Sequence, residues 1–103
     1  MSLPTSLHAY TSELEAFQRA AASPNGIRIE FPDERSARAY LARLHQARVL
    51  DRRENKDIYS PGDPMYGKSD YDSLRVSKRE DETGKFWLYL EKNEIIPGFV
   101  EEL

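Results

Sequence analysis

Residues 27–44, which read IRIEFPDERSARAYLARL, combine two hydrophobic periods and decide the fold. In 27–31 every second residue is apolar, which is typical of a half-buried strand. Asp33 then suits the N-cap of a helix. From Ala37 onward apolar residues recur at three- and four-residue steps, which indicates an amphipathic helix. The stretch therefore predicts a strand followed directly by a helix on the same core.

A second helix is predicted before this unit, in TSELEAFQRAAAS, residues 11–23. Ser12 and Glu15 match the S-x-x-E capping box, and apolar residues recur at helical steps from Leu7 onward. The sequence SPNG at residues 23–26 ends the helix, because proline and glycine interrupt regular structure. Residues 1–11 are ambiguous and could form a flexible N-terminal arm.

Two alternating segments follow in the second half of the chain: YDSLRVSKR, residues 71–79, and FWLYLEK, residues 86–92. A turn around Gly84 separates them, so we expect an antiparallel hairpin. The order helix, strand, helix, long loop, hairpin predicts one α+β domain over residues 1–103. Its sheet would have three strands, mainly antiparallel, with two helices packed on it. The apolar tail NEIIPGFVEEL should dock on the core.

The composition argues against several classes of protein. The chain has 103 residues, a formal net charge of −3 and 32% charged residues, unlike a strongly basic nucleic-acid binder. It has no cysteine, which excludes disulfides and thiolate metal sites and suits a reducing compartment. No apolar run approaches the length of about 20 residues that spans a bilayer. We therefore expect a cytoplasmic protein that does not contact membranes.

The connection at residues 54–70 is long for a compact domain and contains GDPMYGKS, Gly62–Ser69. This octapeptide fits the phosphate-binding pattern G-x-x-x-x-G-K-[ST]. Such a loop works where a strand leads into the N-terminus of a helix. Here it follows a helix and precedes a strand, and Pro64 offers no N–H, so we interpret the match as coincidental. Long loops are often functional. Four side chains of this one are candidate contacts for a partner: Tyr59, Met65, Tyr66 and Lys68.

The sequence predicts no catalytic residue, metal ion or cofactor. The only histidines, His8 and His45, are far apart in the sequence, and the motifs H-E-x-x-H and G-x-S-x-G are absent. Asp72 instead suggests a structural ion pair. The period of the second helix points Arg48 toward the sheet, where the two side chains could meet.

The best candidate surface is the outer face of the sheet, because strand alternation places Trp87 and Tyr89 there. Arginines from all three strands share this face: Arg28, Arg75 and Arg79. Another segment could cover the two aromatic rings. Uncovered, they could form a protein hot spot, in which Trp, Tyr and Arg prevail, or stack nucleic-acid bases. Glu30 and Glu91 weigh against nucleic acid, and the arginine-rich stretch 43–53 weighs for it.

Residues 27–92 also carry a series of motifs. A strand ending in Phe-Pro is followed by A-x-x-x-L-x-x-L-x-x-A-R-x-x-D-R-R-E-N, then I-Y, G-D-P-M-Y-G-x-S-x-Y-D-x-L, and a last apolar strand ending in Glu-Lys. This pattern resembles small accessory proteins of tailed phages and prophages, whose function is unknown. The resemblance implies a bacterial cytoplasm and binding to host or phage machinery, and it carries over no catalytic or ligand residues.

These observations favour a small, non-enzymatic accessory protein that binds another protein through the aromatic sheet face or the 54–70 loop. A homodimer is a further hypothesis. Nucleic-acid binding through the arginines and aromatic rings is the alternative, and nucleotide binding through Gly62–Ser69 is less favoured.

Overall fold

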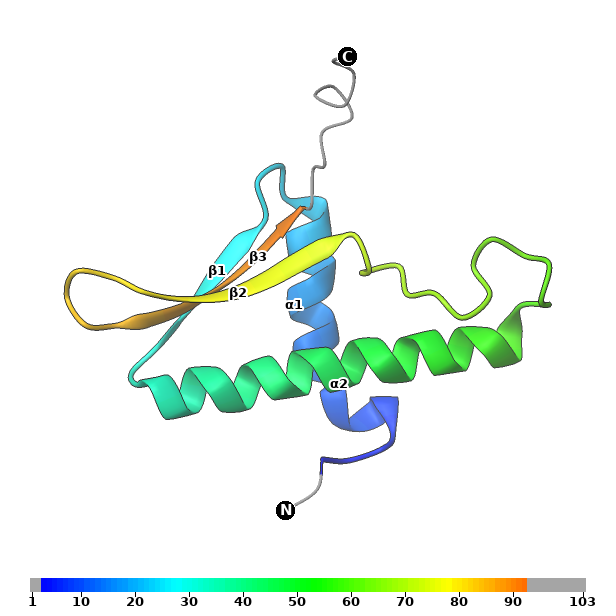
Figure 1. Ribbon diagram of the computed structural model, residues 1–103, viewed down its shortest axis with the longest axis horizontal. Helices are drawn as coiled ribbons and strands as arrows, with labels where there is room; N and C mark the ends of the chain where they lie inside the picture. The colour runs from blue at the N-terminus through cyan, green and yellow to red at the C-terminus, as the bar shows by residue number, and fades with distance from the viewer. Residues whose placement is uncertain (1–2, 93–103) are drawn as a thin grey trace, which may run out of the picture.

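The computed structural model describes residues 3–92 and confirms the predicted α+β fold (Figure 1). Its elements are the short 3-10 helix η1 (Leu7–Tyr10), α1 (Thr11–Ala22), β1 (Ile27–Phe31), α2 (Glu34–Ile58), β2 (Leu74–Glu80) and β3 (Phe86–Lys92). Among the described residues, no helix combines the length and the apolar character needed to span a membrane.

The three strands form one antiparallel sheet in the order β1-β3-β2, so β3 is central and the other two strands are edges. The alternation along β3 has the predicted phase. Leu88 and Leu90 are fully buried on one face, whereas Trp87 and Tyr89 are half-buried on the other. Gly84 has a φ of 87° in the β2–β3 turn, a left-handed conformation that glycine adopts without strain. Residues of both helices join the core on the Leu88 side, so the helices leave the opposite face uncovered.

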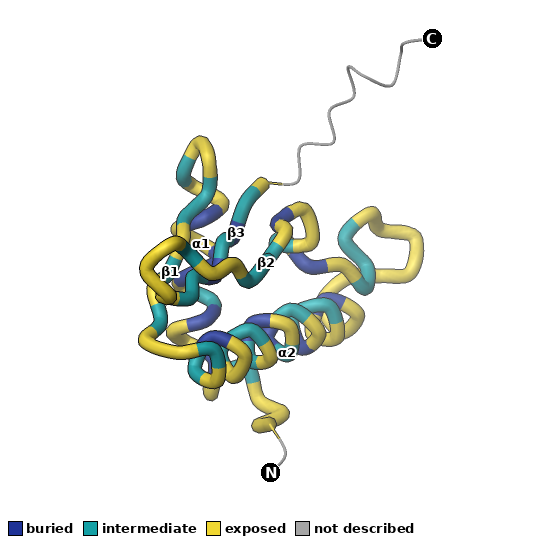
Figure 2. The backbone as a smooth tube through the Cα atoms, turned by 60° about the vertical axis from the view of Figure 1, so that its left-hand side comes forward, coloured by how far each residue is buried: buried dark blue, intermediate teal, exposed yellow. Residues whose placement is uncertain are grey.

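The core lies where α1, α2 and the sheet meet. Its largest fully buried side chains are Tyr10, Phe17, Leu44, Leu88 and Leu90. Burial of a large apolar side chain stabilises a fold by about 1.5–3 kcal/mol relative to exposure. Figure 2 shows buried positions recurring along α2 between exposed ones, as expected of an amphipathic helix.

Helix α2 begins as predicted and ends later than predicted. Asp33 is the N-cap, and its carboxylate accepts a hydrogen bond from the Ser36 N–H at 2.8 Å. The helix continues to Ile58, so residues 54–58 are helical and not part of the loop. No proline or glycine occurs between Asp33 and Pro61, and the charged residues of the last turns are compatible with a solvated helix.

The N-terminal segment differs from the prediction. Ser12 does not cap α1; its hydroxyl forms a 2.8 Å hydrogen bond with the hydroxyl of Tyr40. The chain turns earlier, in η1, where the Ser6 hydroxyl accepts from the His8 N–H. Tyr10 is fully buried and donates to the Pro4 carbonyl at 2.7 Å. Buried Tyr10 and its hydrogen bond to Pro4 thus attach this segment to the domain, although most of residues 3–9 are exposed.

Two further expectations concern the second half. Residues 70–73 form turns, so β2 begins at Leu74 and is shorter than the predicted segment 71–79 at its start. The predicted docking of the tail at residues 93–103 lies outside the described residues.

Candidate functional site

The outer face of the sheet is built around Trp87 and Tyr89, two residues apart on the central strand. The guanidinium carbon of Arg28, on β1, lies 3.9 Å from the centre of the Trp87 ring, and its Nη1 donates to the Tyr89 hydroxyl at 3.2 Å. Arg79, on β2, lies 4.0 Å from the centre of the Tyr89 ring. Each arginine reaches the aromatic residue diagonal to it in the sheet register. Two aromatic rings are therefore each paired with a cation from a flanking strand.

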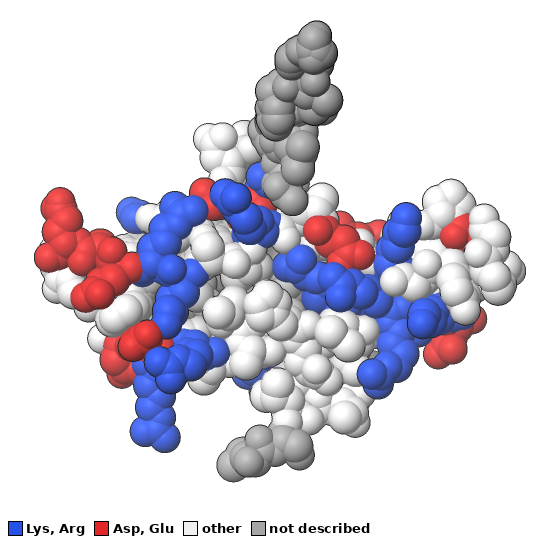
Figure 3. Space-filling model, viewed as in Figure 1, with Lys and Arg blue, Asp and Glu red and all other residues white. Residues whose placement is uncertain are grey.

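Acidic side chains balance the arginines on this face. Glu91 accepts from Arg79 at 2.7 Å and lies 3.6 Å from Arg75. Glu30 pairs with Lys85 at 2.7 Å. Figure 3 shows positive and negative side chains interspersed over the visible side of the molecule rather than gathered into one basic surface.

Asp81, in the turn before β3, holds the Trp87 indole. The Trp87 Nε1–H donates to one carboxylate oxygen of Asp81 at 2.7 Å. The other oxygen accepts from the N–H groups of Thr83 and Lys85 and from the Thr83 hydroxyl. The hydrogen bonds from Trp87 and Thr83 lower the pKa of Asp81 well below its ordinary value. The indole orientation is thus set by an ionised carboxylate that the hairpin turn positions.

The arrangement limits what this face can bind. A guanidinium already lies over each of the two aromatic rings, so it occupies one ring face on which a base could stack. Arg75 and Arg79 already have a carboxylate partner in Glu91. What remains is a nearly neutral surface of aromatic edges, guanidinium groups and carboxylates, which suits a protein surface better than a phosphate backbone.

Gly62–Ser69 does not form a phosphate-binding loop. Several of its N–H groups already have partners nearby: that of Lys68 donates to the Met65 carbonyl at 3.1 Å, and that of Ser69 to the Asp72 carboxylate at 2.9 Å. Turns and then β2 follow the segment, so no helix N-terminus meets it. In the described structure, the segment therefore lacks the strand-to-helix geometry of a phosphate-binding loop.

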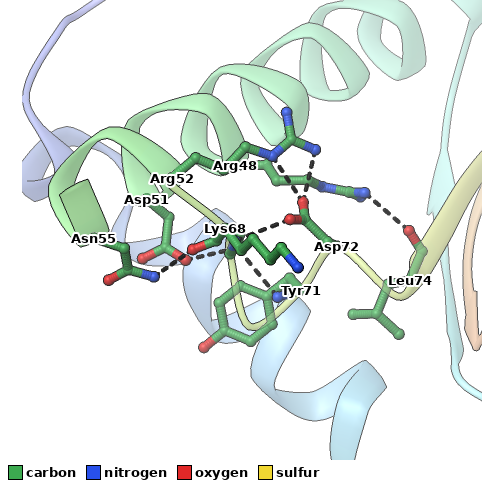
Figure 4. Close-up of polar contacts among 9 residues, drawn as sticks. Arg48, Asp51, Arg52, Asn55, Lys68, Tyr71, Asp72 and Leu74 are labelled. Atoms are coloured by element: carbon green, nitrogen blue, oxygen red, sulfur yellow. Dashed lines mark hydrogen bonds and ion pairs between the residues drawn. The ribbon is translucent and has the colours of Figure 1, made fainter. Parts of the chain in front are cut away.

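The predicted ion pair of Asp72 forms with a different arginine (Figure 4). Arg52 contacts one Asp72 oxygen through Nη2 at 2.6 Å and Nε at 2.8 Å. Arg48 donates instead to the Leu74 carbonyl at 3.0 Å and lies over the Phe17 ring at 5.1 Å. The pairing of Arg48 with Asp72 was therefore wrong by one helical turn, because Asp72 sits in a turn before β2 and not in the strand.

Further contacts fix the end of the loop to α2. The Ser69 hydroxyl donates to Asp51 at 2.6 Å, and the Asn55 side-chain amide donates to the Lys68 carbonyl. The Tyr71 ring stacks on Phe17 of α1, with 5.1 Å between ring centres. Among the four predicted contact residues of this loop, Lys68 is exposed and Tyr59 is 37% exposed, whereas Met65 and Tyr66 are half-buried.

The two histidines remain apart. His8 is exposed in η1. Burial, and then the charges of Arg48 and Arg52, lower the pKa of His45. Within residues 3–92, no group of three or more histidine, aspartate or glutamate side chains lies close enough together to hold a metal ion.

Sequence reasoning missed the two residues that organise these sites, Asp81 and Arg52. A signal for Asp81 was present, because an aspartate that starts a turn commonly accepts from N–H groups further along the chain. Arg52 lies one turn beyond Arg48, and helical period alone does not choose between two positions on nearly the same side.

Comparison of the chain with models of known protein families, with curated proteins and with solved structures found no match.

Proposed function

We propose that this chain is a small protein-binding module with no catalytic role, and that Trp87 and Tyr89 with their arginines form the contact surface. The observation that supports it most is the cation–aromatic arrangement on a sheet face that neither helix covers. Trp, Tyr and Arg dominate the residues that carry binding energy in protein interfaces. Rings held in place before binding also lose less conformational freedom on association.

The carboxylates with displaced pKa values are engaged in structural contacts, which supports a non-enzymatic role. Asp33, whose pKa is lowered mainly by the Ser36 N–H, caps α2. Burial alone would raise the pKa of Asp72, but the hydrogen bonds from Arg52 and the Ser69 N–H outweigh it. Both carboxylates therefore have a role in holding the fold.

The context of the proposal comes from the resemblance of residues 27–92 to accessory proteins of tailed phages and prophages. The partner would then be a component of the host or phage machinery in a bacterial cytoplasm. A contact by the loop, through Tyr59, would extend the surface.

The test uses the wild-type chain as bait for a bacterial lysate, followed by binding assays with each purified candidate. Trp87→Ala and Tyr89→Ala should abolish association and keep the far-ultraviolet spectrum of the wild type. Leu3→Ala, which removes another partly exposed apolar side chain (37%), is the matched control and should bind normally. A partner that binds Trp87→Ala as well as wild type would overturn the proposal, and loss of folding would place Trp87 in the core.

Nucleic acid is the alternative ligand, supported by the arginines and aromatic rings of this face and by the arginine-rich stretch 43–53. Titration with a mixed-sequence single-stranded oligonucleotide at low salt separates the two classes. Quenching of Trp87 fluorescence that salt reverses would indicate stacked bases and phosphate contacts. The proposal expects no quenching.

A further inference from the structure

The edge strand β1 carries a self-complementary sequence, Ile27–Phe31 or IRIEF. Its apolar side chains face the core, and Arg28 and Glu30 face outward. β1 pairs only with β3, so the backbone groups along its other side have no strand partner in the described structure (Figure 1). An unpaired edge is a template for another strand.

The two edges of the sheet differ in how they are protected. On β2, Lys78 points to the helical side of the sheet and pairs with Glu34. The Leu74 carbonyl accepts a hydrogen bond from Arg48. An inward-pointing charge at an edge discourages a further strand. β1 has no such charge on its core side, where Ile27, Ile29 and Phe31 are all half-buried. It is therefore the unprotected edge.

We propose that two copies of this chain associate by antiparallel pairing of β1 with β1, about a two-fold axis through Ile29. In this register Ile29 faces Ile29 of the second copy, and Ile27 faces Phe31 of the second copy. On the outer face, Arg28 lies opposite Glu30 of the second copy, and Glu30 opposite its Arg28. Directly opposed residues on one face lie about 4.5–5.5 Å apart, so both charge pairs can form.

The charges select this register. Moving the axis to Arg28 would place two arginines opposite each other, and moving it to Glu30 would place two glutamates opposite each other, both of which are destabilising. A shift by an odd number of residues would send the apolar side chains to the wrong face. Glu30, whose side chain is 44% exposed beside Lys85, is open enough to accept a second cation.

Space exists beside the edge on the core side. A groove of about 390 Å³ lies between β1 and α1, and its lining is partly apolar (Ala16, Ile27, Ile29) and partly polar (Ser12, Glu15, Arg19, Arg28). The core-facing side chains of a second β1 would enter this groove. The pairing would give a six-stranded sheet in which the outer faces of the two copies are continuous. The candidate contact surface would thus be extended, but the pairing does not depend on that surface binding a partner.

Sedimentation equilibrium of the full chain over a dilution series tests the pairing. The wild type should approach twice the 11.9 kDa mass of one chain at the highest concentrations. R28E and E30R should each remain at the mass of one chain, because like charges then face each other. The double variant R28E/E30R should recover the association. Glu80→Arg, a charge reversal in the other edge strand, should associate like the wild type.

Cross-linking tests the same register without altering charge. The chain has no cysteine, so I29C introduces a single thiol at the one position that faces itself across the axis. Opposed Cα atoms in an antiparallel pair lie within the range that a disulfide spans. A mild oxidant should link I29C into dimers and leave V76C, on the same face of β2, as monomers.

A wild type that stays monomeric throughout the series would overturn the proposal. Single charge variants that still associate, or a double variant that fails to recover, would also overturn it. The register would be wrong if I29C gave no more disulfide-linked dimer than V76C.

Discussion

Arg28 connects the two aromatic residues of the outer face: its guanidinium lies 3.9 Å from the centre of the Trp87 ring and donates to the Tyr89 hydroxyl. One exposed side chain of β1 thus fixes the positions of two side chains of β3. The face is arranged before any partner arrives, which lowers the entropic cost of binding.

Arg28→Ala should reduce the free energy of unfolding by about 0.5–1 kcal/mol, the range for an exposed cation–aromatic contact. Urea unfolding at low protein concentration, followed by circular dichroism, measures the change. Arg35→Ala, which removes an exposed arginine from α2, is the control and should have a smaller effect. Equal effects in the two variants would mean that the contact with Trp87 contributes no stability.

Asp81 should make the stability of the hairpin depend on pH in the acid range. Its pKa is lowered in the folded chain from an ordinary 3.8, mainly by the Trp87 hydrogen bond. A carboxyl whose pKa is lower in the folded than in the unfolded chain stabilises the fold. This stabilisation is fully present at pH values above the unfolded-state pKa. It is lost as the pH falls toward the folded-state pKa.

The difference in free energy of unfolding between wild type and Asp81→Ala should therefore be constant from neutral pH down to about pH 5 and shrink below pH 4. Urea titrations at each pH measure it. A difference that grows as the pH falls would contradict the assignment.

Asp72 should be coupled to Arg52 and not to Arg48. A double-mutant cycle with Arg52→Met and Asp72→Asn should give a coupling free energy of about 0.2–1 kcal/mol, because the Arg52 side chain is 42% exposed and solvent screens the pair. The cycle that replaces Arg52→Met by Arg48→Met should give a smaller coupling. A larger coupling free energy for Arg48 than for Arg52 would instead support the Arg48–Asp72 pair predicted from the sequence.

Nucleotides should not stabilise the chain. Because the N–H groups of Lys68 and Ser69 are used within the loop, Mg-ATP and Mg-GTP should leave the melting temperature unchanged at millimolar concentration. Lys68→Ala should melt like the wild type. A nucleotide-dependent rise that Lys68→Ala removes would show that the loop rearranges to bind phosphate.

The elements with a clear hydrophobic period were predictable. Ile27–Phe31, the start of α2 at Asp33 and the two faces of β3 follow from alternation and capping alone. The outer-face candidates Trp87 and Tyr89 followed from the same period. Whether another segment covers these two rings or leaves them exposed depends on where the helices pack. A local sequence pattern does not specify that.

Contacts between distant residues were not predictable in the same way. Glu13, which the sequence analysis did not single out, is buried and pairs with Arg43 of α2 at 2.7 Å. Ser12 bonds Tyr40 instead of capping its helix. Both follow from the angle at which α1 crosses α2, and the period of either helix alone does not determine that angle.

Acrylamide quenching of Trp87, the only tryptophan, tests most directly the claim that the outer sheet face is an open surface. The full chain should show a quenching constant between those of free and fully buried tryptophan, and Arg28→Ala should raise it because the ring loses its guanidinium cover. A blue-shifted emission that acrylamide does not quench would contradict the account, since it would mean that another part of the protein covers the face.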